Sequence, residues 1–205
     1  MRAFVALIFR ACLGLACLLA GCSITRATNP PRTATEQLLI STAVDRAVAG
    51  MKFDIPKGTS VFVDAANFEG YDSKYAVASV TERVLQEGGR FAMDRSKADM
   101  VVALRSGALS TDEDGYLIGI PAIGVPVPLM GTLNLPELAL FKKDETRGVA
   151  KFAATLYDQR SGALKSVSGA SYGFSHKTHW VIAMIAWTRN DTLPAGVEPE
   201  HDHGP

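Results

Sequence analysis

The segment 169–173, with the sequence GASYG, matches the pattern G-x-S-x-G, in which a serine acts as the nucleophile of a hydrolase. This chemistry needs Ser171 on a sharp strand-to-helix turn, with an acid and a histidine later in the chain. Asp191 and then His201 or His203 occur in that order. The chain after Ser171 is too short for the remaining strands and helices of such an enzyme. Because small residues on a sheet face give the same pattern, we expect no catalysis at Ser171, and a serine hydrolase stays the alternative.

Two further groups contain residue types that can serve as metal ligands in proteins. His176 and His179 have the spacing H-x-x-H, which shares one face of a helix but points to opposite sides of a strand. Neither cysteines nor an HExxH arrangement supply more ligands nearby. The acidic run from Asp112 to Asp114 precedes Gly115, but it lacks the spacing and the closing glutamate of a calcium loop. The sequence therefore predicts neither a metal site nor a cofactor.

The three cysteines, Cys12, Cys17 and Cys22, all lie at the start of the chain. Basic residues up to Arg10 precede an uncharged run over 11–20. A short basic region followed by an apolar run of this length is typical of a secretory signal. The run is too short to span a bilayer, which needs about 20 apolar residues.

The end of this signal, LAGC at 19–22, resembles the lipobox of bacterial lipoproteins. The resemblance implies a signal peptide over 1–21 that is cleaved before Cys22. It also implies a diacylglycerol thioether on the Cys22 sulfur and an acyl chain on the new amino group, so that the partner is a lipid bilayer. Three acyl chains anchor a protein firmly, whereas one binds only marginally. By the same resemblance, Ser23 after the cysteine points to the cell outer membrane, with the protein on its periplasmic side.

The rest of the chain has the composition of one globular domain. Basic and acidic residues balance at 21 each and form no basic stripe, which argues against nucleic acid as a partner. We expect a lipidated tether over 22–32, a single periplasmic domain over 33–189 and a disordered tail over 190–205. Prolines in the tether and the tail favour extended chain over helix.

Hydrophobic periodicity and turn residues predict the elements of this domain. A capping box from Thr33 to Glu36 starts the first helix, and Ser73 is expected to cap the second. The expected elements are helices over 33–50 and 73–87, strands over 59–68, 90–94 and 98–109, an acidic turn at 111–115, and a hairpin of 149–160 with 163–175. The segment 179–188 is compatible with a last strand or a short helix, and we favour the strand. This order predicts an α+β fold, with two helices packed on one face of a mixed, mostly antiparallel sheet.

The arrangement resembles small outer-membrane lipoproteins of export machinery, such as the curli-secretion pore subunit and the exopolysaccharide-export ring. The resemblance rests on the helix before the first strand, the hairpin sequence LYDQRSGAL and the lipobox. The expected anchor, the compact α+β domain and the lack of a catalytic constellation in the sequence predict a non-enzymatic structural or assembly component of the envelope, with a protein partner or a homo-oligomer. The alternatives are an esterase that uses Ser171 and a ligand-binding module.

The segment 116–141 contains no charged residue from Tyr116 to Pro136. Its prolines and glycines predict a loop, because proline is excluded from helix interiors and central strands. Its many large apolar residues are unusual for a loop. Either the segment completes the core, or it contacts the membrane or a partner through exposed residues. The candidate contact residues are Ile120, Ile123, Val125, Val127, Leu129 and Met130. Trp180 and Trp187 belong either to the core or to such an interface.

Overall fold

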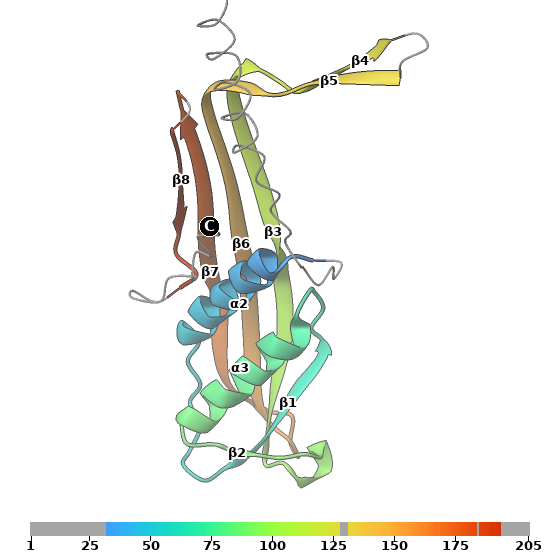
Figure 1. Ribbon diagram of the computed structural model, residues 1–205. Coiled ribbons are helices and arrows are strands. Elements are labelled where there is room, and N and C mark those ends of the chain that lie inside the picture. Colours follow the sequence, from blue (N-terminus) through green and yellow to red (C-terminus); the bar gives the residue numbers. More distant parts are fainter. Residues whose placement is uncertain (1–31, 128–130, 184, 194–205) are drawn as a thin grey trace, which may run out of the picture. The chain divides into compact units, whose positions relative to one another are not determined.

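The computed structural model describes residues 32–127, 131–183 and 185–193 (Figure 1). The elements are α2 (Ala34–Ala49), β1 (Ser60–Asn67), α3 (Ser73–Gln86), β2 (Arg90–Phe91), the 3₁₀ turn η1 (Arg95–Lys97), β3 (Met100–Ile120), β4 (Ile123–Val127), β5 (Gly131–Leu135), β6 (Leu138–Asp158), β7 (Leu164–Ile182) and β8 (Ile185–Asn190). The expected signal peptide and the tether before Arg32, with Cys22, lie outside the described residues. So do His201 and His203 in the expected tail.

The described strands form a six-stranded sheet in the order β2-β1-β3-β6-β7-β8, together with a separate two-stranded hairpin of β4 and β5. β1 pairs in parallel with β2 and with β3. The pairs β3–β6, β6–β7 and β7–β8 are antiparallel. The prediction of an α+β fold is confirmed, and the sheet is mixed.

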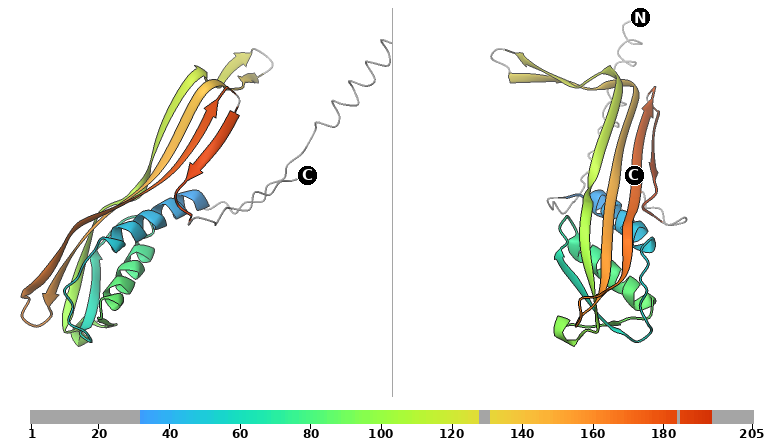
Figure 2. Two further views of the ribbon diagram at one scale, coloured as in Figure 1. Left: turned by 90° about the vertical axis from the view of Figure 1, so that its left-hand side faces the viewer. Right: turned by 180° about the vertical axis from the view of Figure 1, so that it is seen from behind.

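The two helices pack on the same face of the sheet (Figure 2). α2 starts with the predicted capping box, in which the Glu36 amide donates to Thr33 Oγ1 and the Thr33 amide donates to Glu36 Oε2. α3 starts differently from the prediction, because its cap is Asp72 in a left-handed conformation (φ 55°) and not Ser73. Ala76, Val80 and Val84 are the buried residues of α3, and Leu85 is exposed.

The core lies between the helices and one end of the sheet. It is mainly aliphatic and also contains the rings of Phe68 and Phe152, which pack against each other in a tilted arrangement (5.1 Å between centroids). Its largest fully buried members include Ile40, Val44, Met51, Val61, Val80, Val84, Val102, Leu104, Phe152 and Leu156. Burying each such side chain stabilises the fold by roughly 1.5–3 kcal/mol relative to exposure, so this end of the sheet carries the hydrophobic stabilisation of the domain.

Small residues of β6 and β7 let the backbone of α2 approach the sheet closely. A Cβ on Gly173 would overlap the carbonyl oxygen of Ala43, and one on Gly148 would lie 2.5 Å from the carbonyl oxygen of Leu39. Next to Gly173, the Ser171 hydroxyl donates to the carbonyl oxygen of Ala47 at 2.6 Å. The GASYG segment is therefore the part of β7 on which α2 packs.

The acidic segment 111–115 is not a turn, as the sequence predicted, but the middle of β3. It pairs with residues 144–148 of β6, and the Asp114 carboxylate accepts a hydrogen bond from Arg147 at 3.0 Å. Cross-strand pairing of opposite charges allows acidic residues in a strand that solvent reaches. The expected loop 116–141 is likewise wrong, because it forms the end of β3, the hairpin β4–β5 and the start of β6.

Proline is tolerated in this region because the hairpin has only two strands. Pro126 of β4 pairs with Thr132 of β5, in a strand without a second neighbour among the described residues. The expected last strand over 179–188 is divided between β7 and β8, which turn at Ala183 (φ 46°). The prediction of a strand rather than a helix for this segment is confirmed.

Candidate interaction surface

Four strands continue past the helices as a sheet without helical cover (Figure 2). We call this part the distal sheet: residues 110–120 of β3, 138–147 of β6, 176–182 of β7 and 185–190 of β8. Side chains alternate between its two faces. Leu109 and Ala150 lie in the core under the helices, and their pairing identifies the helix-side face. The opposite face is the outer face.

The outer face carries three successive rows of paired residues that change from charged to aromatic to aliphatic. In the strand order β3, β6, β7 and β8, the rows are Asp114–Glu145–Thr178–Arg189, Tyr116–Lys143–Trp180–Trp187 and Ile118–Phe141–Ile182–Ile185. The charged row lies nearest the helices, and the aliphatic row lies at the far end. This polarity gradient runs along the strands.

The aromatic row is well packed although it is partly exposed. The rings of Trp180 and Trp187 stack at 6.3 Å between centroids with 8° between their planes. Phe141 meets Trp180 edge-on at 6.0 Å. The Lys143 ammonium lies 5.2 Å from the Trp180 ring and also pairs with Glu145. Such contacts fix the rings and leave their outer surfaces available.

The helix-side face of the distal sheet is mainly polar. Lys177 lies 3.3 Å from the Thr35 hydroxyl of α2, and His179 Nδ1 lies 3.1 Å from the Thr188 hydroxyl. Lys142 pairs with Glu137 at 3.0 Å, and this hydrogen bond raises the pKa of Lys142. The distal sheet is thus amphipathic, with the apolar rows on its outer face.

The hairpin β4–β5 extends the apolar region. The pairs Ile123–Leu135 and Val125–Leu133 lie on one face, and the other face carries Gly124, Pro126, Thr132 and Asn134. An apolar cleft of about 630 Å³ follows at the start of β6, lined mainly by Ile120, Leu138, Leu140 and Val181.

Most large side chains of this end are exposed to solvent, and together they form what we call the distal surface. Its members are Tyr116, Ile118, Ile120, Ile123, Val125, Leu133, Leu135, Leu138, Leu140, Ile182, Ile185 and Trp187. Ile118 is 63% exposed and Ile185 is 69% exposed. Large exposed apolar side chains gathered at one end of a molecule mark a contact site for a membrane or a protein.

The sequence named three contact residues of this surface, left Trp187 between core and interface, and missed most of the others. Ile120, Ile123 and Val125 are exposed there. Val127 belongs to β4, and Leu129 and Met130 lie outside the described residues. The short continuous apolar runs at 116–120 and 138–141 were the available signal, because runs of this kind bounded by turn residues are consistent with strands.

The structure does not bring the candidate catalytic and metal-binding residues together into one site. Ser171 lies on the regular strand β7, opposite Phe152, and not on a strand-to-helix turn. His176 and His179 lie on opposite faces of β7, as expected for a strand. Within the described part of the chain, no group of three or more histidine, cysteine or acidic side chains is placed to hold a metal ion.

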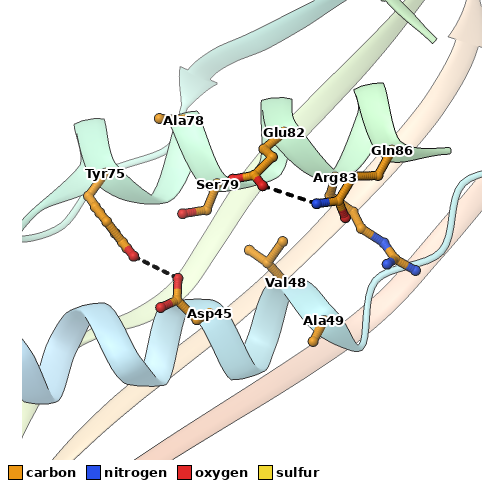
Figure 3. Close-up of a pocket in the computed structure, with 9 residues that line it drawn as sticks. All are labelled: Asp45, Val48, Ala49, Tyr75, Ala78, Ser79, Glu82, Arg83 and Gln86. Carbon is orange, nitrogen blue, oxygen red and sulfur yellow. Dashed lines mark hydrogen bonds between the residues drawn. The ribbon is translucent and has the colours of Figure 1, made fainter. Parts of the chain in front are cut away.

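A polar groove of about 510 Å³ lies between α2 and α3 (Figure 3). Two pairs of its polar side chains bond each other: the Tyr75 hydroxyl donates to Asp45 at 2.8 Å, and Gln86 donates to Glu82 at 3.0 Å. Burial, together with the hydrogen bond to Asp45, raises the pKa of Tyr75. Arg83 donates to the carbonyl of Met51 at 3.1 Å. We therefore interpret these contacts as ones that hold α2 and α3 together.

A comparison with models of protein families shows which family the chain belongs to. A family model matches residues 16–195. The chain belongs to the family of unknown function DUF6655. The match includes both helices and every described strand, so the distal surface of this DUF6655 chain lies inside the family region. A comparison with curated proteins found no match. Among the described residues, no helix is both long enough and apolar enough to cross a membrane.

Proposed function

We propose that this DUF6655 protein is a non-enzymatic lipoprotein of the bacterial envelope, anchored through Cys22, facing the periplasm from the outer membrane, and acting as a structural or assembly component. The distal surface is its contact with the bilayer. The observation that carries this proposal is the order of the three rows on the outer face, from charged through aromatic to aliphatic.

This order matches the order of environments at a membrane surface. Tyrosine and tryptophan prefer the boundary between water and lipid, and aliphatic side chains prefer the acyl region beyond it. Adjacent rows are two residues apart, roughly 7 Å along a strand. That depth corresponds to shallow insertion, since interfacial elements bury their apolar side about 5–10 Å. The uncharged hairpin β4–β5 adds apolar area at the same end.

The alternatives receive less support. An esterase needs a free nucleophile beside a histidine, whereas the Ser171 hydroxyl donates to the Ala47 carbonyl at 2.6 Å under α2. A ligand-binding module needs a concave site with convergent polar groups. In the groove between α2 and α3, Tyr75 is instead bonded to Asp45 and Gln86 to Glu82.

Lipid attachment is tested by metabolic labelling with a palmitate analogue. Parent protein should be labelled and Cys22→Ser should not be, because a hydroxyl cannot form the thioether. Equal labelling of both would rule out the anchor.

Membrane contact by the distal surface is tested separately, on lipidated protein in vesicles that contain brominated phosphatidylcholine. The chain has two tryptophans, and both lie in the aromatic row. Bromine on the acyl chains should therefore quench most of the fluorescence. Ile123→Asp with Val125→Asp should weaken the quenching and leave the circular dichroism spectrum unchanged.

The matched control is Thr132→Asp with Asn134→Asp, which adds the same charge to the polar face of the same hairpin. The control should be quenched like the parent. Parent protein that is labelled with palmitate but not quenched would reject the bilayer contact and retain the anchor. Unfolding of the Ile123 and Val125 variant would show that these residues belong to a core.

A further inference from the structure

The distal sheet has two open edges, one along β3 and one along β8. β1 pairs with β3 only as far as Arg105, opposite Asn67. Beyond that point β3 pairs with β6 alone among the described strands. β8 is the other end of the strand order and pairs with β7 alone in the same described part. Each edge presents a row of backbone N–H and C=O groups, which is a template for pairing with another strand.

We propose that copies of this protein associate edge to edge, with β8 of one copy pairing antiparallel to β3 of the next. The occupant of each edge is thus a second copy of the chain. This inference goes beyond the bilayer contact and does not require it. Strand direction supports it: the four strands alternate in direction, so β8 and the β3 of a neighbour would continue the antiparallel order.

One register between β8 and the β3 strand of the neighbour continues each of the three outer-face rows from one copy into the next. In this register the side chains at the two edges are complementary. On the outer face, this register places Ile185 beside Ile118, Trp187 beside Tyr116, and Arg189 beside Asp114 of the neighbour. These are an aliphatic, an aromatic and an oppositely charged pair. Each such cross-strand pair contributes roughly 0.2–1 kcal/mol. A register shifted by one residue would put these partners on opposite faces.

Charge supplies a second reason for this partner. Arg189 forms no ion pair among the described residues, and neither does Asp112 at the opposite edge. Asp114 has Arg147 as its one ion-pair partner in that part of the chain. The β3 edge therefore carries an acidic run, and the β8 edge carries a cation on the same face. Because the two edges differ, the contact is head-to-tail, which gives a ring if it closes and an open chain if it does not.

The acidic run has a competing explanation, since charges on an edge strand also prevent pairing. The two explanations predict opposite effects of mutation. If Asp112 and Asp114 guard the edge, neutralising them increases association. If they attract Arg189 of the neighbour, neutralising them decreases it.

Disulfide trapping of the full-length lipidated protein in detergent tests the pairing. Ile118→Cys with Ile185→Cys probes the outer face, and Leu117→Cys with Ala186→Cys probes the helix-side face. One of the two must be a non-hydrogen-bonded pair, whose Cα atoms lie closer together. Within one chain these positions are three strands apart, roughly 14 Å. This is beyond the reach of a disulfide, which needs Cα atoms within about 7 Å.

Oxidation should convert at least one in-register variant into dimers and larger species on a non-reducing gel. The control variant Leu117→Cys with Ile185→Cys places its thiols on opposite faces and should stay monomeric, as should the unmodified chain, whose cysteines all precede Ser23. If both in-register variants give no more cross-linked product than this control, the pairing is wrong.

A charge exchange tests the register on the same in-register cysteine background. Arg189→Glu should lower the cross-linking yield roughly fivefold, and adding Asp114→Lys should restore it. Arg189→Gln should give an intermediate yield. An increase in yield on Asp112→Asn with Asp114→Asn would instead identify the acidic run as a guard against pairing and overturn the proposal.

Discussion

Arg46 of α2 holds Asp191, the residue that follows β8. Its guanidinium donates to the Asp191 carboxylate at 2.9 Å and to the Asp191 carbonyl oxygen at 2.8 Å. The same carboxylate accepts the His176 amide of β7 at 2.7 Å. One side chain therefore connects a helix, a strand and the end of the edge strand. The expected disordered tail over 190–205 is wrong at its start, since Asn190 belongs to β8 and Asp191 makes these contacts; residues 194–205 lie outside the described residues.

Replacing Asp191 should loosen β8. Burial raises the pKa of Asp191, but the hydrogen bonds from the His176 amide and from Arg46 outweigh it and lower the pKa overall. Because the side chain is partly exposed, we expect Asp191→Ala to reduce the free energy of unfolding by only about 1 kcal/mol. Hydrogen exchange should show faster exchange of the β8 amides and unchanged exchange in β1. Equal acceleration in both strands would contradict a local role.

Gly173 is the position of β7 that tolerates a side chain least. A Cβ there would overlap the Ala43 carbonyl oxygen and lie 2.6 Å from the Ala47 amide nitrogen, both of which are helix backbone. We expect Gly173→Ala to destabilise the domain by about 3 kcal/mol, because α2 would have to move away from the sheet. Gly169 of the same strand has no atom within 4 Å of such a Cβ. Gly169→Ala should therefore stay within about 0.5 kcal/mol of the parent in urea unfolding.

The Ser171 hydroxyl is expected to matter for stability and not for hydrolysis. Ser171→Ala removes the donor to the Ala47 carbonyl and should cost about 1 kcal/mol of unfolding free energy. Turnover of a short-chain nitrophenyl ester by the purified protein should be at background level before and after the substitution. Activity in the parent that disappears in Ser171→Ala would restore the hydrolase alternative.

Local signals in the sequence predicted the elements near the core. The capping box at Thr33, the periodicity that predicted a helix over 33–50 and the residue types that predicted a strand over 59–68 are all local signals, and these two elements are confirmed as α2 and β1. The distal sheet was missed because its strands are stabilised by neighbours far away in the sequence. Asp114, for example, lies opposite the like-charged Glu145, and it is accommodated in a strand because Arg147 of β6 forms an ion pair with it. The point along β3 at which the helices stop covering the sheet could not be predicted from local patterns, because the position of a helix over a sheet depends on tertiary packing.

The bidentate pair of Arg32 and Asp72 should make the stability of the domain depend on pH. Both guanidinium nitrogens lie 2.6 Å from the carboxylate oxygens, and the pair joins the start of α2 to the start of α3. The hydrogen bond from Arg32 lowers the pKa of Asp72 below its ordinary value. A carboxylate whose pKa is lower in the folded state stabilises the fold above its unfolded pKa, about 3.9. This contribution is lost as the pH falls through the folded value.

A double-mutant cycle with Arg32→Gln and Asp72→Asn measures this contribution. At pH 7 we expect a coupling free energy of about 1 kcal/mol, because the pair is bidentate and only about one quarter of each side chain is exposed. The coupling should decline below pH 4 as Asp72 is protonated, and it should weaken in high salt. The cycle of Lys97 with Asp94, a pair that is mostly exposed, serves as the control and should show little coupling at any pH. A coupling between Arg32 and Asp72 that persists unchanged at pH 2 would show that the contact is not ionic.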